Sequence, residues 1–338
     1  MKTVVLGAGR MGRRHIHVVK QMGLDLIGVC DSNPEALSLA EAEEDVSKEL
    51  HFPDADSMLN ELRPECVVVS TTATSHCELT CQASRLGAKY ILCEKPLATS
   101  LSECDRMIHT CQQHGTKLAV NHQMRFMEQY TEPKLLLNTP EYGGLTSVSV
   151  IAGNFGLAMN GTHYFEMFRF MTDEAPLSIT AWFSKEYVPN PRGKQFEDHA
   201  GSVRMVTPSG KRFYMDVSAD QGLGLKVVYA ARNGQIVVDE LSGEVSALFR
   251  EEEFRELPTT RYGMPAVRAD INIEPADVFT PTRDVLDSLL NGGPYPSGEE
   301  GRLAIASLVA AYISNENGNR TIHINEAESS HARIFPWA

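Results

Sequence analysis

Residues 2–12 have the sequence K-T-V-V-L-G-A-G-R-M-G, a short apolar run followed by three glycines in the spacing G-x-G-x-x-G. Such a run is typical of a buried strand, and a helix-like pattern continues to about Met22. Gly7 permits a tight turn, Gly9 lets a pyrophosphate approach the backbone, and Gly12 lets the helix pack closely on the strand. Because a helix N-terminus favours negative charge, the stretch predicts a dinucleotide-binding loop. Its expected cofactor-binding residues are Gly7, Gly9, Arg10, Met11 and Gly12.

A second strand, predicted over Leu24–Cys30, ends in Asp31, nineteen residues after Gly12. A carboxylate at this position suits the ribose hydroxyls of NAD and repels the 2′-phosphate of NADP. We therefore expect Asp31 and the neighbouring Ser32 to bind NAD, with NADP less favoured. A glycine turn with an incidental aspartate is the alternative interpretation.

Helices and strands alternate through the rest of the first third. This alternation predicts a parallel, doubly wound α/β sheet of the Rossmann type. The expected helices are Pro34–Glu44, Asp56–Leu62, Ser75–Leu86 and Ser102–His114, and the expected strands are His51–Phe52, Glu65–Ser70, Ala88–Ile91 and Lys117–Asn121.

The tripeptide Glu94-Lys95-Pro96 follows one of these strands. Open α/β sheets bind ligands at the carboxyl ends of their strands, so Lys95 lies where a ligand is expected. Pro96 restricts Lys95 to an extended backbone, and the peptide bond between them is a candidate for the cis form. A solvated surface lysine is the alternative. The residues Thr71, Thr72 and His76, which follow the fourth strand on the same edge, favour the ligand-binding interpretation.

Composition excludes several classes of partner. The formal net charge of −13 over 338 residues argues against nucleic acid and anionic membranes. No apolar run approaches the ~18–20 residues that a membrane span needs. We also expect no secretory signal, because neither a basic stretch nor an apolar leader-like stretch comes before the first strand. Seven cysteines without a C-x-x-C motif favour reduced thiols, and we expect a cytoplasmic protein. His76, Cys77 and Cys81 have no fourth ligand, so no metal is expected.

The remaining two thirds have a different pattern. Short strands joined by turns such as Pro208-Ser209-Gly210 and Asn233-Gly234 predict an α+β domain with a large, mostly antiparallel sheet. We expect a Rossmann domain over 1–121 and a substrate and oligomerisation domain over 122–338, whose C-terminal helices can pack back on the first. The expected strands are Leu145–Ala152, Leu177–Phe183, Gly201–Thr207, Arg212–Ser218, Lys226–Ala231, Gln235–Glu240 and Val245–Arg250, followed by a surface excursion over Arg261–Phe279 and helices over Thr282–Leu290 and Glu299–Ser314.

The segment 156–166, G-L-A-M-N-G-T-H-Y-F-E, carries a candidate acid–base residue. If Asn160 is the N-cap of a helix, His163 lies in the first turn, where the helix dipole favours the neutral imidazole. Glu166, three residues further on, shares that helix face and is a candidate to orient the ring. A satisfied core histidine is the equally open alternative.

Together these motifs resemble the Gfo/Idh/MocA family, which includes glucose–fructose oxidoreductase and inositol dehydrogenases. The resemblance extends over nearly the whole chain and is most specific at Glu94-Lys95-Pro96. It implies an NAD(P)-dependent dehydrogenase acting on CH–OH groups, which transfers a hydride between a sugar, polyol or sugar-derivative carbinol and nicotinamide. Catalytic roles are implied for Lys95, which would polarise the reacting oxygen, and for His163 as acid and base. A homodimer or homotetramer is implied as well.

Two positions depart from the family pattern. Relatives commonly have an aspartate four residues before the histidine, where this chain has Met159, so Glu166 or Asn160 would have to substitute for it. Thr71-Thr72 replaces the usual threonine-proline. Two alternatives therefore stay open, a redox-neutral enzyme with tightly bound NAD, acting in glycoside cleavage or epimerisation, and a non-catalytic NAD-binding sensor.

Glu94 is an expected cofactor contact. The expected substrate contacts are Lys95, Asn121, Arg125, Asn160 and His163, with Asp198 and His199 as further candidates whose positions do not identify the sugar.

Overall fold

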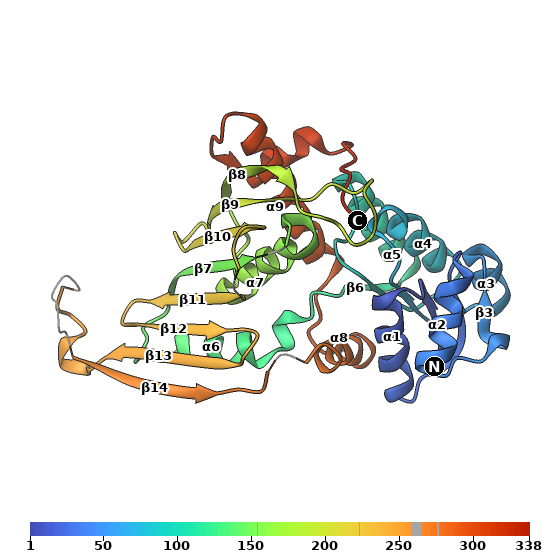
Figure 1. The fold of residues 1–338 in the computed structure, drawn as a ribbon, viewed down its shortest axis with the longest axis horizontal. Helices are drawn as coiled ribbons and strands as arrows, with labels where there is room; N and C mark the ends of the chain where they lie inside the picture. Colours follow the sequence, from blue (N-terminus) through green and yellow to red (C-terminus); the bar gives the residue numbers. More distant parts are fainter. Residues whose placement is uncertain (154, 223, 259–264, 276) are drawn as a thin grey trace. The chain divides into compact units, whose positions relative to one another are not determined.

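The computed structural model describes residues 1–338 except 154, 223, 259–264 and 276. The chain divides into two compact units (Figure 1). The first comprises residues 1–123, 278–305 and 330–338, and the second comprises residues 124–277 and 306–329. No helix within the described ranges is both long and apolar enough to cross a membrane.

A six-stranded parallel sheet forms the centre of the first unit, with strand order β3-β2-β1-β4-β5-β6. The order reverses between β1 and β4, and this switch point is where open α/β sheets bind ligands. The predicted Rossmann sheet is confirmed. Its strands are β1 (Lys2–Leu6), β2 (Asp25–Cys30), β3 (His51–Phe52), β4 (Cys66–Val69), β5 (Tyr90–Cys93) and β6 (Lys117–Val120).

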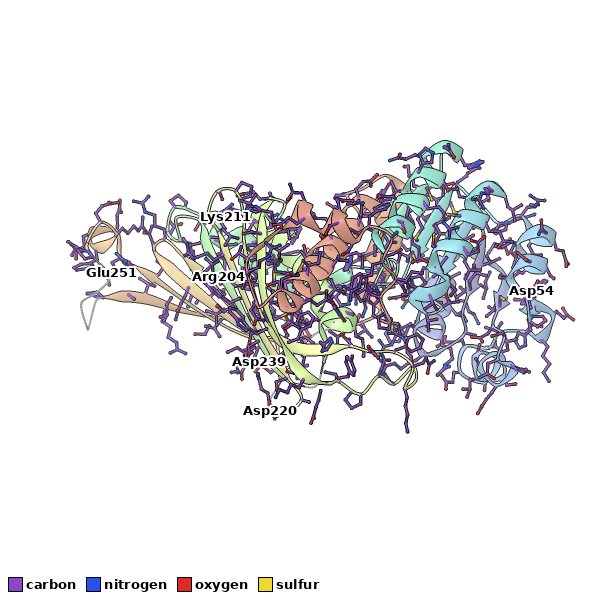
Figure 2. The ribbon with its side chains drawn as sticks, turned by 90° about the horizontal axis from the view of Figure 1, so that it is seen from above. Asp54, Arg204, Lys211, Asp220, Asp239 and Glu251 are labelled. Carbon is purple, nitrogen blue, oxygen red and sulfur yellow. The ribbon has the colours of Figure 1, made fainter. Side chains whose placement is uncertain are left out.

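Helices connect these strands, and α2, α3 and α5 each begin at a side chain that caps the first turn. Asn33 accepts the N–H of Glu35 at the start of α2, and Asp54, labelled in Figure 2, accepts the N–H of Ser57 at the start of α3. The later helix α8 contacts α1, β5 and β6. The helices are α1 (Arg10–Gln21), α2 (Pro34–Glu44), α3 (Ala55–Leu62), α4 (Ala73–Arg85), α5 (Leu101–His114) and α8 (Thr280–Asn291).

The second unit is built on a nine-stranded sheet with order β14-β13-β12-β11-β7-β10-β9-β8-β15. β7 and β10 are parallel and every other neighbouring pair is antiparallel, which confirms the predicted mostly antiparallel sheet. The strands are β7 (Leu145–Gly153), β8 (Ser178–Tyr187), β9 (His199–Val206), β10 (Arg212–Ser218), β11 (Lys226–Ala231), β12 (Gly234–Asp239), β13 (Glu244–Arg250), β14 (Ala266–Asn272) and β15 (Ile322–His323).

Strand β14 corrects the expected surface excursion over Arg261–Phe279. Seven of its residues pair with β13 in an unbroken antiparallel register, from Ala266 opposite Arg250 to Asn272 opposite Glu244. The local sequence has no strand periodicity, and β14 forms because its backbone pairs with that of β13. Residues 261–264 and 276 of the expected excursion lie outside the described part of the chain.

Three helices accompany the sheet of the second unit: α6 (Glu128–Leu137), α7 (Thr162–Thr172) and part of α9 (Gly298–Glu316). Helix α9 contributes residues 298–305 to the first unit and 306–316 to the second. Ser297 caps it, because its hydroxyl accepts the N–H of Glu300 and the Glu300 carboxylate accepts the N–H of Ser297. Alternating burial along β10 marks one covered face of the sheet: Phe213, Met215 and Val217 are buried, whereas Tyr214 and Asp216 are exposed.

A carboxyl group is buried in the second unit. Glu240 accepts hydrogen bonds from the hydroxyls of Tyr130 and Tyr164, and the hydroxyl of Tyr229 is buried nearby. Burial raises the pKa of Glu240 to about 7, although the two hydrogen bonds act in the opposite direction. The folded protein therefore holds this proton more tightly than the unfolded chain does.

We predict that Glu240 makes the unit less stable as the pH rises. Between about pH 4.5 and pH 7 the unfolded chain ionises this carboxyl group while the folded chain keeps it protonated. The free energy of unfolding should fall by about 3 kcal/mol across this window, at about 1.4 kcal/mol per pKa unit. Urea unfolding at several pH values should show a flatter profile for Glu240→Gln. Glu252→Gln, at an exposed position, is the control, and an unchanged slope in Glu240→Gln would contradict the assignment.

Candidate functional site

The glycine loop has the geometry that the motif requires. Gly7 has a φ of +94°, and a Cβ there would lie 2.8 Å from the backbone of Ser70. A Cβ on Gly12 would overlap the carbonyl oxygen of Gly7. In contrast, a Cβ on Gly9 would meet no protein atom within 4 Å among the described residues. The fold itself thus explains two of the glycines, and the open space at Gly9 is what a pyrophosphate needs.

Helix α1 starts at this loop without a capping side chain. Its N-cap is Gly9, and its first residue, Arg10, is exposed while Met11 is half-buried. The N–H groups of a helix's first turn have no partner within the helix and point along its axis, so they can bind a phosphate. The residues present therefore fit a dinucleotide.

Asp31 fastens the loop to the end of β2. One carboxylate oxygen accepts the N–H of Ala8 at 2.8 Å and the other accepts the N–H of Asn33 at 2.8 Å. Each oxygen of a carboxylate can accept a second hydrogen bond, so Asp31 can also bind a ribose hydroxyl. Ser32 is exposed beside it.

Glu94 connects three elements at the carboxyl edge of the sheet. It is 2% exposed, and one of its oxygens lies 2.8 Å from His15 Nε2 and 2.8 Å from Asn121 Nδ2. The other oxygen accepts the N–H of Lys95 at 3.2 Å. Burial alone would raise the pKa of Glu94, but the partners His15, Lys95 and Asn121 together hold it well below its ordinary value. Glu94 thus positions the residues around it from inside the protein.

His15 was not among the residues predicted for the site. It lies on α1, three residues after Gly12, and is buried. The sequence signal that could have identified His15 is a histidine on the buried face of the helix that follows the glycine loop.

His76 lies between the loop that follows β4 and the loop that follows Lys95. Its ring is 1% exposed, with Nδ1 3.1 Å from the carbonyl oxygen of Pro96 and Nε2 3.1 Å from that of Thr71. Burial lowers the pKa of His76. Both ring nitrogens face backbone carbonyl groups, and the one N–H of the neutral imidazole can donate to one of them at a time. The Lys95–Pro96 peptide bond is cis, and Thr72 is the N-cap of α4.

In the second unit, the helix that carries His163 begins earlier than predicted. A π-helical turn, η3 (Leu157–Gly161), runs directly into α7, so Asn160 lies inside the turn and is not the N-cap. The cap comes from a distant residue, because the buried carboxylate of Asp198 accepts the N–H groups of Ala158 and Met159, both at 2.8 Å. Such π-helical turns are frequent at functional sites.

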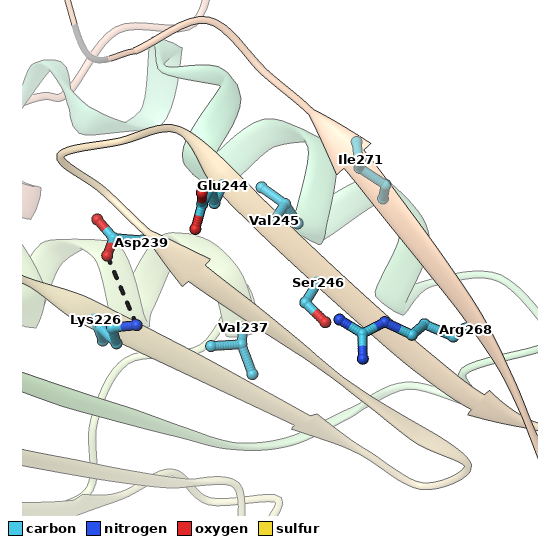
Figure 3. Close-up of a pocket in the computed structure, with 8 residues that line it drawn as sticks. All are labelled: Lys226, Val237, Asp239, Glu244, Val245, Ser246, Arg268 and Ile271. Carbon is cyan, nitrogen blue, oxygen red and sulfur yellow. Dashed lines mark ion pairs between the residues drawn. The ribbon is translucent and has the colours of Figure 1, made fainter.

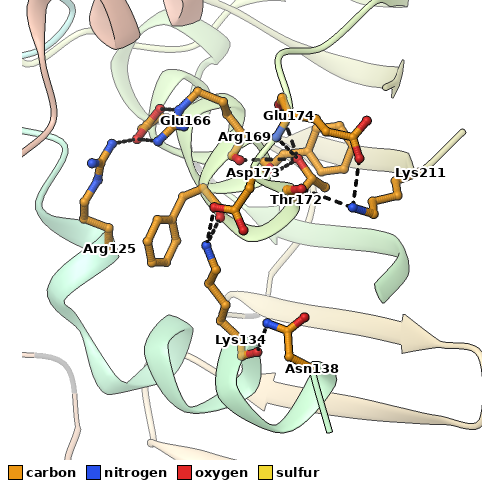
Figure 4. A network of polar contacts seen from close by, with 11 residues as sticks. Arg125, Lys134, Asn138, Glu166, Arg169, Thr172, Asp173, Glu174 and Lys211 are labelled. Carbon is orange, nitrogen blue, oxygen red and sulfur yellow. Dashed lines mark hydrogen bonds and ion pairs between the residues drawn. The ribbon is translucent and has the colours of Figure 1, made fainter. Parts of the chain in front are cut away.

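The predicted contact between Glu166 and His163 is not formed in the structure. The carboxylate of Glu166 is bound by Arg125 and by Arg169, the latter at 2.7 and 3.0 Å (Figure 4). Arg125 also lies over the ring of Phe170, 5.6 Å from its centroid. Glu166 therefore holds guanidinium groups and is not the group that orients the imidazole.

The structure places the candidate substrate contacts Arg125, Asp198 and His199 in three different surroundings. Arg125 belongs to a 3₁₀ turn, η2 (Gln123–Phe126), and Asp198 is a buried cap. His199 is packed among the rings of Phe183, Tyr187 and Tyr312. His163 is 8% exposed at the start of α7.

A pocket of about 350 Å³ lies elsewhere in the second unit (Figure 3). It is formed by β11, β12, β13 and β14, and the ion pair between Lys226 and Asp239 lies on its wall. The described residues that line it include none of the candidate site residues. Nor do the described parts of the chain contain a group of three or more histidine, cysteine or acidic side chains placed to hold a metal ion.

Comparison with known proteins agrees with this geometry. Residues 1–122 match the family described as an oxidoreductase family with an NAD-binding Rossmann fold. These features define an NAD-binding Rossmann fold in the first unit. The match covers residues 1–122 and carries the name Gfo/Idh/MocA, which agrees with the resemblance drawn from the motifs.

Individual relatives match to different extents. A D-apiose dehydrogenase of Paraburkholderia graminis is 25% identical over 97% of this chain and 91% of its own length. A 2,7-anhydro-N-acetylneuraminate hydratase of Mediterraneibacter gnavus is 32% identical, but over only 41% of this chain and 36% of its own length. An oxidoreductase from Agrobacterium radiobacter, crystallised with NAD⁺, L-tartaric acid and magnesium, has the same fold, with a TM-score of 0.81 and 20% identity over 96% of this chain and 99% of its own.

The different surroundings of Gly9 and Gly12 give a direct test of the loop. Gly9→Ala should fold like the parent chain, since its Cβ meets no protein atom, but should bind NAD at least about tenfold more weakly by blocking the pyrophosphate. Gly12→Ala should lose thermal stability as well, because its Cβ overlaps the Gly7 carbonyl. Melting curves with and without NAD measure both effects. Parental NAD affinity in Gly9→Ala would show that the dinucleotide lies elsewhere.

Proposed function

We propose that this protein is an NAD-dependent dehydrogenase that transfers a hydride between nicotinamide and a carbinol carbon of a sugar, polyol or sugar derivative. The observation that carries the proposal is the glycine loop, fastened by Asp31 and followed along the same sheet edge by Lys95 beside the buried Glu94. The similarity to a D-apiose dehydrogenase over nearly the whole chain supports a sugar as substrate.

The cofactor residues have separable roles in this proposal. The loop over Gly7–Gly12 and the start of α1 would hold the pyrophosphate, and Asp31 and Ser32 would bind the adenosine ribose. Thr71 and Thr72 would contact the dinucleotide, with Glu94 and His76 fixing the backbone around Lys95. Bound NAD would supply the hydride acceptor.

Lys95 would bind the reacting hydroxyl oxygen of the substrate. An ammonium group stabilises the negative charge that develops as the hydroxyl proton leaves. Glu94, which receives the Lys95 N–H, holds this lysine's backbone from inside the protein.

His163 would take the hydroxyl proton, because a neutral imidazole is a suitable base near neutral pH. Its helix is anchored by Asp198 through the backbone of the preceding turn, a device that needs no carboxylate at position 159. Asn160 and Arg125 remain proposed substrate contacts in the second unit.

Asn121 is proposed as a further substrate contact. Its amide nitrogen donates to Glu94, while its buried Oδ1 makes no hydrogen bond within the described residues. A buried acceptor of this kind is costly unless a donor reaches it, and a sugar hydroxyl is such a donor.

A redox-neutral enzyme that keeps NAD bound is the second candidate, because one relative is a hydratase. The two candidates differ in net NADH production and in whether NAD copurifies with the protein. A cytoplasmic location and assembly into a homodimer or homotetramer remain predictions.

Lys95→Met tests the leading proposal. Loss of the ammonium should lower kcat by about 10²–10³-fold, as for the removal of one oxyanion donor. NAD affinity should stay within about threefold, because the loop and Asp31 are untouched. The activity is measured as NADH formation against a panel of sugars and polyols.

Lys89→Met is the matched control, since Lys89 pairs with Glu65 at the exposed opposite end of β5. It should turn over like the parent protein. Full activity in Lys95→Met would refute the catalytic assignment of this lysine.

A further inference from the structure

Residues 330–338, called the tail segment below, belong to the first unit and lie against the chain that follows Lys95. The N–H of Phe335 donates to the carbonyl of Thr99 at 2.9 Å. The indole N–H of Trp337 donates to the carbonyl of Ala98 at 2.9 Å. Two consecutive carbonyl groups, three and four residues after Lys95, are thus satisfied by the tail segment.

The side chains of the tail segment are part of the core. Trp337 is 0% exposed and Phe335 is also buried, and their rings stack with centroids 4.5 Å apart and planes inclined by 10°. The guanidinium group of Arg333 lies over the ring of Phe335, 4.5 Å from its centroid. If the tail segment moved away, the space that these two rings fill would become a cavity, so the rings anchor the segment.

The other end of the tail segment is anchored on α5. The N–H of Ser102 donates to the carbonyl of His331 at 2.9 Å, and the ring of His331 lies 2.8 Å from the carboxylate of Asp105. Asp105 in turn binds Arg302 at 2.5 and 3.0 Å. In Figure 1 the end of the chain accordingly lies beside α5.

The backbone from Pro96 to Ser102 is therefore held from two sides. His76 faces the carbonyl groups of Pro96 and Leu97. The tail segment binds the next two carbonyl groups and the start of α5. A lysine that binds a reacting oxygen must hold its ammonium group within about 0.5 Å of the productive position. A backbone fixed in this way provides that accuracy.

We propose that Trp337, with Phe335, is a positioning residue that fixes the backbone behind Lys95 and thereby the place of its ammonium group. The inference rests on the proposed function of Lys95. It assigns to the tail segment a role in turnover that acts through the backbone of residues 98, 99 and 102.

The experiment compares Trp337→Phe, Trp337→Ala and Ile334→Ala with the parent protein. Trp337→Phe keeps an aromatic ring but removes the donor to Ala98, and it remains informative if Trp337→Ala does not fold. Ile334 lies in the same segment with 71% of its surface exposed and is the matched control.

Three readouts are taken for each variant. Hydrogen–deuterium exchange reports the backbone over residues 95–104. The rate and pH midpoint of Lys95 acylation by a small amine-reactive ester, measured by peptide mass spectrometry relative to Lys89, report the lysine itself. Steady-state kinetics and an NAD titration separate kcat from cofactor affinity.

In Trp337→Phe we expect faster exchange over residues 95–104, a shifted acylation profile for Lys95 and a fall in kcat of about tenfold, with NAD affinity and KM within about twofold. Trp337→Ala should show larger changes of the same kind, and Ile334→Ala none. The proposal is overturned if exchange and Lys95 acylation stay parental. It is equally overturned if every peptide exchanges faster and NAD affinity falls together with the melting temperature. If the parent protein turns over no sugar or polyol, the proposed function fails, while exchange and acylation still decide the role of Trp337.

Discussion

The carboxylate of Glu94 is buried with three donors around it, and the first unit's candidate site depends on this arrangement. His15 comes from the helix that carries the glycine loop, Asn121 follows the neighbouring strand, and the third donor is the N–H of Lys95 itself. A buried charge is tolerated only when it is paired and hydrogen-bonded. The three elements must therefore meet at Glu94, and their meeting sets the position of Lys95 relative to the phosphate loop. His76 and the tail segment then fix the backbone that leads away from Lys95.

Carboxylates in the second unit serve the same purpose through different partners. Asp198 caps the π-helical turn before His163 by accepting two backbone N–H groups, and Glu166 holds Arg125 and Arg169. Met159, which lacks the charge of the family's usual aspartate, lies in the turn that Asp198 anchors. The carboxylate at position 198 acts on the backbone here, so the helix that carries His163 is fixed without a charged side chain at position 159. In each unit a buried carboxylate, Glu94 or Asp198, thus binds the backbone of the segment that carries the candidate catalytic residue, Lys95 or His163.

Much of the fold could be predicted because its signals are local. The glycine loop, the apolar strands of the first unit and the hairpin turns of the second lie within short windows of sequence.

The features that were predicted wrongly or missed mostly depend on residues far apart in the chain. Asn160 has the right side chain for an N-cap, but Asp198, which immediately precedes β9, takes that role. Helix α6 was not predicted because Pro133 interrupts its pattern, and β14 is defined by its partner β13. No local pattern indicates that Trp337 packs against residues that follow Lys95. The site residues of the first unit were found by motif, whereas His15 was missed because its importance comes from a partner 79 residues away.

Calorimetric titration of the purified protein with NAD and, separately, with NADP tests most directly whether the loop fastened by Asp31 is an NAD site. Saturable binding of NAD is predicted, at least about tenfold tighter than that of NADP, because a carboxylate at the ribose position repels a 2′-phosphate. Binding of neither nucleotide, or tighter binding of NADP, would contradict the assignment of the glycine loop and Asp31.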